Sequence, residues 1–396
     1  MTVTEQPVQV DTNVIERLEA LQPLLRERAV KVEEQARLDD EVLDALTEAG
    51  AFRLGTPKRF GGLEADIATQ QRAFAAIARG CGSTGWVTSL YGFGSWATGL
   101  YDDRAQDEVF ADGPDVRIAG IFSPTGTLTP VDGGYKLTGR WGFNTGRLHA
   151  AWDHLAAVVT KPDGEMEIRM VLVPTSELGL VEDWDTIGLR GTGSHTSTAE
   201  DVFVPEHRSI DLNAALRGDY RTETNKERAL YSTGFFAHVL AISSGVPIGI
   251  AQAAMDHFLE RLPGRGITYT AWKVQSEAPI THYAVADAQV RIESAGLLAD
   301  QVANDVYGTA SAGGSMDTRT RADVRARVGY LTELSREAVG ILRKHSGASA
   351  VQKAVPIQQC FRDIEVLSTH AALAYATNSE VYGRVLVGID PNTPFL

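Results

Sequence analysis

The chain has 396 residues, of which 43% are hydrophobic and 22% charged, and its formal net charge is −14 at pH 7. This length exceeds one ordinary hydrophobic core and predicts two or three domains, while the composition is that of a globular protein. The acidic balance argues against nucleic acid as a partner, because binding to phosphates requires a basic face.

The amino-terminal segment MTVTEQPVQVDTNV has neither a basic region nor an apolar run, so we expect no secretory signal. The longest apolar segment, 235–254, is interrupted by polar residues, glycines and Pro247, which argues against a membrane span. Cys81 and Cys360 fit no metal-binding spacing, and we predict no metal site. These features predict a cytoplasmic protein that contacts no membrane.

Residues 1–115 predict an N-terminal helical domain. Its first helix is indicated by apolar residues at helical spacing, Ile15, Leu18, Leu21 and Leu25. The segment DDEVLDALTEAG begins with acidic residues and ends at Gly50, as a short capped helix does. The stretch GWVTSLYGFGSWATGL holds two tryptophans and several glycines, which would let helices approach one another closely.

Short β-rich runs separated by turn residues fill residues 116–210 and predict a middle β domain, with a hairpin at Val131–Tyr135. Residues 211–396 return to long helical patterns, at 235–262, 283–306, 318–342 and 356–387. Because the helical, β and helical patterns follow one another without alternating β-α-β units, the predicted fold class is α+β.

Four segments, in this order along the chain, resemble the acyl-CoA dehydrogenase superfamily: CGSTGWVTSLYGFGSW, IAGIFSPTGTLTPVDGGYKLTGRWGFNTGRLHAAW, WDTIGLRGTGSHTSTAEDVFVPEHR and HSGASAVQKAVPIQQCFRDIEVLSTH. The resemblance spans nearly the whole chain and is closest to the two-component (group D) flavin-dependent monooxygenases. It implies an acyl-CoA dehydrogenase-like fold, with an N-terminal helical domain, a middle β-barrel-like domain and a C-terminal four-helix bundle. It also implies a homo-oligomer, most simply a tetramer.

The run Trp141–Gly146 combines aromatic faces with polar groups, and an isoalloxazine ring requires both. The cofactor-binding residues that the resemblance implies are Phe122, Ser123, Trp141, Phe143, Thr145 and Arg265. The alternative for Trp141 and Phe143 is that they are ordinary core aromatics. The alternative for Arg265 is a solvated loop arginine.

His370 follows Asp363 by seven residues, close to two helical turns, so we expect the two side chains on one helix face. In the related monooxygenases a histidine at this place touches the C4a side of the flavin, where an imidazole can donate to a hydroperoxide. The resemblance implies catalytic roles for His370, Thr145 and Asn144. The alternative is that His370 is a structural histidine on an apolar helix.

Tyr91, Phe93, Trp96 and His149 are the predicted walls of the substrate pocket. Aromatic hydroxylases of this branch often carry a histidine where this chain has Gly94, so the resemblance does not supply a base for deprotonating a phenol.

The function that the resemblance implies is flavin-dependent monooxygenation. Reduced FMN, or FAD, from a separate NAD(P)H-dependent reductase would react with O2 through a C4a-hydroperoxide to oxygenate a small aromatic or heteroatom-containing molecule. The alternatives are an N-oxygenase or oxidase acting on an amine or nitro compound, an acyl-CoA dehydrogenase, and a non-catalytic helical scaffold without flavin. The dehydrogenase alternative lacks its Tyr-Glu-Gly motif, since Glu380 lies in a different setting.

Overall fold

The computed structural model describes residues 12–161 and 164–396. The amino-terminal helices are α1 (Thr12–Glu19), α2 (Gln22–Gln35), α3 (Asp40–Ala49), α4 (Ile67–Gly80), α5 (Gly82–Thr98) and α6 (Asp103–Val109). The strands are β1 (Ile118–Val131), β2 (Gly134–Trp141), β3 (Trp152–Thr160), β4 (Met166–Pro174), β5 (Gly179–Val181), β6 (Thr196–Pro205) and β7 (Ser209–Asp211). The later helices are α7 (Leu212–Leu216), α8 (Phe235–Ser243), α9 (Gly245–Glu260), α10 (Pro279–Ala303), α11 (Thr309–Ser311), α12 (Thr318–His345), α13 (Ile357–Leu367) and α14 (Tyr375–Leu386).

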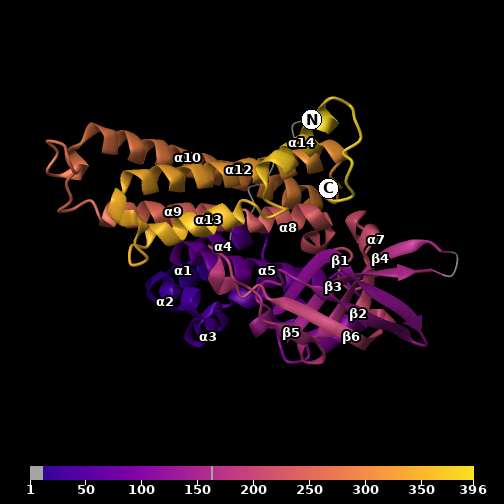
Figure 1. Ribbon diagram of the computed structural model, residues 1–396. Helices are drawn as coiled ribbons and strands as arrows, with labels where there is room; N and C mark the ends of the chain where they lie inside the picture. The colour runs from indigo at the N-terminus through magenta and orange to yellow at the C-terminus, as the bar shows by residue number, and fades with distance from the viewer. Residues whose placement is uncertain (1–11, 162–163) are drawn as a thin grey trace.

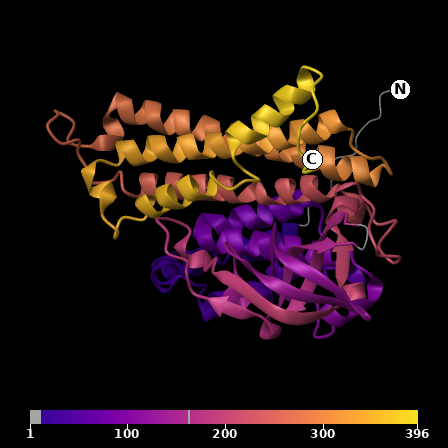
Figure 2. The same ribbon diagram turned by 45° about the vertical axis from the view of Figure 1, so that its right-hand side comes forward.

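Figure 1 shows the amino-terminal helices and the sheet side by side, beneath a layer of long carboxyl-terminal helices, and Figure 2 shows the same layering after rotation. The expected fold class, helical, then β, then helical, is confirmed. Short local signals explain several element ends. In α3, the Asp39 side chain accepts from the Glu41 N–H and Gly50 ends the helix at φ 88°, as the sequence predicts.

Helix α5 is the central helix of the amino-terminal part, and its glycines let neighbours approach. A Cβ on Gly85 would lie 2.5 Å from the Ala78 Cβ, and one on Gly94 would lie 2.3 Å from the Ile118 carbonyl oxygen of β1. Both distances are shorter than real contacts allow, so these positions require glycine. A histidine at position 94 would not fit without moving β1 away from the helix.

The seven strands form one sheet in the order β5-β6-β2-β1-β3-β4-β7. The β1–β3 pair is parallel and the other pairs are antiparallel, and the predicted hairpin is confirmed with Val131 opposite Gly134. Although three strands separate β4 from β6 in this order, the two come into contact, so the sheet curls into a barrel-like shape around its own apolar core. Strands β5 and β7 remain its two edges.

Helices α9, α10, α12 and α13 pack against one another as a bundle. The segment Phe235–Glu260, which holds α8 and α9, is the one stretch of the described chain long and apolar enough to cross a membrane. Its most apolar window is 94% buried inside the protein, so it serves as a core segment of the bundle.

The helix expected over 356–387 is interrupted. Helix α13 ends at Leu367 and α14 begins at Tyr375, so the prediction that Asp363 and His370 share one helix face is wrong. His370 lies in the intervening turn, where its carbonyl accepts from the Leu373 and Ala374 N–H groups. The turn lets the chain change direction beside the sheet and brings His370 into a cavity.

Candidate active site

A cavity of about 630 Å³ lies where loops of the sheet meet α5, α8, α12, the turn after α13 and the last residues of the chain. Its walls are mainly apolar and aromatic, with hydroxyl groups, one imidazole and one guanidinium among them. Of the predicted site residues, five line it, namely Phe122, Ser123, Phe143, Thr145 and His370.

His370 faces the cavity, and its ring meets Trp86 edge-on with 5.0 Å between ring centroids. His370 is exposed to solvent in the cavity, and the protein atoms around it lower the pKa of its imidazole below 6.5 by partial desolvation, so the ring is mainly neutral near pH 7. Its Nδ1 accepts from the Ala372 N–H at 3.3 Å. The single ring proton is therefore on Nε2, which can donate into the cavity.

Thr145 and Ser194 line the cavity with hydroxyl groups 2.8 Å apart, and Ser194 lies 2.7 Å from the Thr192 hydroxyl. Thr192 donates its only proton to the Leu189 carbonyl, so Ser194 donates to Thr192 and Thr145 donates to Ser194. The Thr145 oxygen consequently presents lone pairs to the cavity and acts there as an acceptor.

Phe143, two residues before Thr145 in the same loop, has φ 61°, which an aromatic residue rarely adopts. Its side chain is 75% exposed and meets Trp184 edge-on at 5.6 Å. Together the two rings form an aromatic rim on the sheet side of the cavity.

Asn144 points away from the cavity into a buried polar cluster. Its side-chain amide donates to Asp153 Oδ2 at 2.6 Å and to Ser197 Oγ at 2.7 Å, and Arg147 Nε donates to the same Ser197 oxygen at 3.0 Å. Burial raises the pKa of Asp153 from 3.8 to about 7, although Ser197, Arg147 and Asn144 oppose the shift. The cluster holds the loop that carries Phe143 and Thr145, so Asn144 is a positioning residue and does not touch the cavity.

Trp141, predicted to bind the cofactor, does not line the cavity and is instead the core aromatic that the alternative interpretation expected. Its indole is fully buried in the separate core of the sheet and donates to the Ala156 carbonyl at 2.7 Å. Alternation along β2 explains this, because residues on a strand point to opposite faces and Trp141 takes the inner one.

Tyr91, Phe93 and Trp96 do not line the cavity either, although all three lie on α5. Tyr91 donates to the Gly146 carbonyl and so braces the loop, Phe93 packs behind Phe122 with ring centroids 5.1 Å apart, and Trp96 stacks on His238. The cavity-facing residues of α5 are Trp86 and Leu90, four residues apart on one helix face.

His149 and Arg265 also lie off the cavity. His149 ends a short 3₁₀ turn, and burial lowers its pKa to about 4. Arg265 donates to the Ser346 carbonyl at 2.7 Å from the loop between α9 and α10, which Figure 1 shows at the far end of the bundle from α8. Arg265 therefore does not reach the cavity of its own chain.

On the bundle side, the cavity is lined by residues that sequence reasoning missed, Phe236, Val239, Arg325 and Phe395. Phe236 and Val239 lie within a mainly apolar segment, and no motif marks Arg325 or the last residues of the chain. Asp363, behind the cavity, accepts the Leu189 N–H at 2.7 Å, and burial raises the pKa of Asp363 to about 7.

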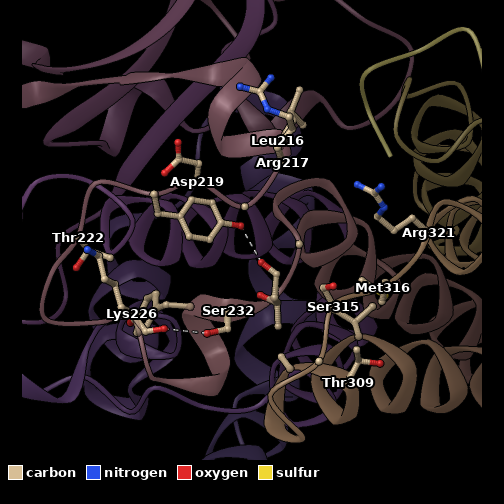
Figure 3. A pocket seen from close by; sticks show the side chains of 18 residues that line it. Leu216, Arg217, Asp219, Thr222, Lys226, Ser232, Thr309, Ser315, Met316 and Arg321 are labelled. Carbon is tan, nitrogen blue, oxygen red and sulfur yellow. Dashed lines mark hydrogen bonds between the residues drawn. The ribbon is translucent and has the colours of Figure 1, made fainter.

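A second cavity, of about 490 Å³, lies between the α7–α8 connection and the start of α12. Figure 3 shows Arg217, Asp219 and Arg321 around it. Among the described residues no group of three or more His, Cys, Asp or Glu side chains is arranged to hold a metal ion.

The family model for the acyl-CoA dehydrogenase N-terminal domain matches residues 19–101, and that for the C-terminal domain matches residues 241–375. A pigment production hydroxylase from Rhodococcus sp. is 33% identical over 97% of this chain and 99% of its own length. The flavin-dependent monooxygenase oxygenase subunit HsaA from Rhodococcus jostii is 33% identical over 94% of this chain and 97% of its own. The solved structure of XiaF from Streptomyces sp., in complex with FADH2 and glycerol, superposes with a TM-score of 0.91 at 29% identity and covers 97% of both chains.

The chain therefore belongs to the acyl-CoA dehydrogenase family, within its branch of two-component flavin-dependent monooxygenases. The cavity residues fit a flavin ring. Aromatic and apolar walls match the ring faces, and the acceptor oxygen of Thr145 and the donor Nε2 of His370 supply polar contacts at its edges.

The Asp153 cluster predicts a pH-dependent contribution to stability. Because the pKa of Asp153 is raised from 3.8 to about 7, the folded state holds a proton in this range that the unfolded state has released. The contribution of this proton to the free energy of unfolding is complete below about pH 4 and is lost as the pH rises to about 7 and beyond. The asparagine of Asp153→Asn stays neutral at every pH. The Tm of this variant minus that of the wild type should therefore increase by a few degrees between about pH 5 and about pH 8.

Thermal melts of both proteins at the two pH values measure this gain. Asp185→Asn, at an exposed surface carboxylate, is the control and should follow the wild type at both. Parallel pH profiles for Asp153→Asn and the wild type would contradict the raised pKa.

Proposed function

We propose that this protein is the oxygenase component of a two-component flavin-dependent monooxygenase that oxygenates a small aromatic or heteroatom-containing molecule. The reduced flavin would come from a separate NAD(P)H-dependent reductase. The observation that carries the proposal is the mainly apolar cavity with an acceptor hydroxyl, Thr145, and a neutral imidazole donor, His370, on its walls. The names of the relatives, a hydroxylase and an oxygenase subunit, support it.

Reduced flavin supplies the electrons that activate dioxygen, and the residues of the chain orient the reactants and exclude water. Phe122, Phe143 and Trp184 offer faces for a flavin ring, and the Thr145 oxygen offers an acceptor suited to the N5–H of its reduced form. His370 Nε2–H offers a donor to oxygen bound in the cavity. Both FMN and FAD have such a ring. We propose reduced FMN as the cofactor, because the cavity residues named here provide contacts for the isoalloxazine ring only.

Dehydrogenation of an acyl-CoA is disfavoured by the same cavity. Among the described residues no Asp or Glu lines it, so no carboxylate there can remove a proton from carbon. Glu380, the one glutamate considered from the sequence, lies on α14 and is 3.4 Å from Arg384.

The proposal is tested by mixing the protein anaerobically with reduced FMN or FAD, then adding oxygen and a panel of aromatic and heteroatom-containing compounds. We expect tight binding of the reduced flavin, reoxidation slower than that of free flavin, and a product containing one atom from O2. Reoxidation at the rate of free flavin, without product, would instead favour an oxidase or a scaffold. N-oxidised products from amines or nitro compounds would favour the N-oxygenase alternative.

His370→Ala should uncouple the reaction without unfolding the protein. Removing one donor from the cavity is worth about 1–3 kcal/mol, so the ratio of hydrogen peroxide to product should rise roughly 5- to 150-fold. His370→Gln, whose amide N–H reaches about as far as Nε2, should restore part of the coupling. Peroxide and product measured per reduced flavin give the ratio.

His282→Ala, at an exposed histidine on α10, is the control and should couple like the wild type. If His370→Ala keeps the wild-type ratio, the histidine has a structural role only.

We propose further that the protein is a homotetramer acting in the cytoplasm. The apolar segment 239–250 is buried within the chain and offers no surface for association. The support comes instead from the outer face of α10, where Tyr283, Val290 and Leu297 are 70%, 60% and 72% exposed at seven-residue intervals. Light scattering at micromolar concentration should give four times the chain mass, and Leu297→Glu should lower it; a monomeric wild type would contradict the proposal.

A further inference from the structure

Arg325 is the one permanently charged side chain that lines the active-site cavity among the residues the structure describes. It comes from the first third of α12 and is only 8% exposed. The other ionisable group on the walls, His370, is neutral near pH 7, and no carboxylate faces the cavity from the described part of the chain.

The contacts of Arg325 are all with neutral groups. Its Nε donates to Asn378 Oδ1 at 2.7 Å, its Nη1 donates to the Phe395 carbonyl at 2.5 Å, and the guanidinium lies 5.2 Å from the ring centroid of Phe236. Within residues 12–161 and 164–396, no Asp or Glu lies within ion-pair distance of it, and its Nη2 has no hydrogen-bond partner. Burial lowers the pKa of Arg325, and the charge of Glu380 on α14, beyond ion-pair distance, opposes this shift only in part.

A buried charge that no counter-charge contacts is costly, and a guanidinium stays protonated and presents five N–H donors. The bonds to Asn378 on α14 and to the Phe395 carbonyl account for two of those donors, on Nε and Nη1. They do not account for a net positive charge beside an otherwise apolar cavity in a protein whose overall charge is −14. An anionic group on a bound molecule would supply both the missing charge and acceptors for Nη2.

We propose that the natural substrate is an aromatic molecule bearing a carboxylate, and that Arg325 is the specificity-determining residue that binds this group. The inference rests on the proposed function, since it names the substrate class of the same cavity. The carboxylate would lie on the wall formed by α12, Phe236 and Phe395, and the aromatic ring would extend into the apolar part of the cavity. Because the same guanidinium holds the Phe395 carbonyl, substrate binding and the position of the carboxyl terminus are linked.

The test compares two probes of nearly equal shape, 3-(4-hydroxyphenyl)propanoate and its primary amide. Their dissociation constants are measured by calorimetry under argon on the protein loaded with reduced flavin, so that the readout does not depend on turnover. The wild type should bind the carboxylate roughly 10- to 100-fold more tightly than the amide, as expected for a charge-assisted hydrogen bond in a buried site. In Arg325→Gln this ratio should fall close to one, and in Arg325→Lys it should be intermediate.

Arg321→Gln is the matched control, because Arg321 lies one turn earlier on α12 and faces the second cavity (Figure 3). It should keep the wild-type ratio. The affinity for the amide reports whether the cavity is intact, and it should be nearly unchanged in Arg325→Gln. Equal loss of both probes would show that Arg325 only anchors the carboxyl terminus, and it would overturn the inference, as would a wild-type ratio near one.

The two proposals fail separately. If reduced flavin binds and slows its reoxidation but the preference for the carboxylate is absent, the substrate inference alone is wrong. If reduced flavin does not bind, the proposed function is wrong, and the same titrations without flavin still decide whether Arg325 selects an anion.

Discussion

The buried carboxylate of Asp153 holds the loop on which the cavity depends. Asn144 and Ser197 donate to one of its oxygens, and Arg147 approaches from the other side of Ser197. The loop must be fixed in this way because it places Phe143 at φ 61° and turns the Thr145 hydroxyl toward Ser194, conformations that local propensity does not favour. Asp363 plays a similar part on the bundle side, where it accepts the Leu189 N–H and joins α13 to the loop before β6.

Close packing fixes how near α5 lies to strand β1 and to the loop after β2. Gly94 lies against the Ile118 carbonyl, and Tyr91 reaches from the same helix to the Gly146 carbonyl. The approach of β1 leaves no room for a histidine at position 94. The Gly94 carbonyl lies 3.1 Å from Nε2 of His154 on β3, and burial lowers the pKa of that imidazole to about 4. His154 is fully enclosed and bonds Thr98 and Tyr101, so it contributes to structure and not to the cavity.

The charges around the cavity are consistent with oxygenation. A neutral imidazole, hydroxyl groups and mainly apolar walls offer few groups that take up or release a proton near pH 7. Arg325 is the exception, because it is a cation in a wall without a carboxylate. It makes the α12 side of the cavity positively charged while the sheet side stays neutral. An elongated substrate would have a charged end at α12 and an apolar end toward the sheet.

The sequence by itself determined the order of helical and β parts, the hairpin at Val131–Tyr135, the capped helix ending at Gly50 and, through its resemblance to a family, the placement of His370, Phe143 and Thr145 at one site. These features follow from local periodicity, turn chemistry and motifs.

Only the tertiary structure decided which way each side chain points. Trp141 and Asn144 turn inward, Tyr91 and Trp96 face away from the cavity, and Arg265 lies at the far end of the bundle. Arg325 and Phe395 are 70 residues apart and reach the cavity together. The direction of a side chain depends on how helices and strands that are far apart in the sequence pack together. A periodic pattern shows that a residue is buried, but it does not show which residues it packs against.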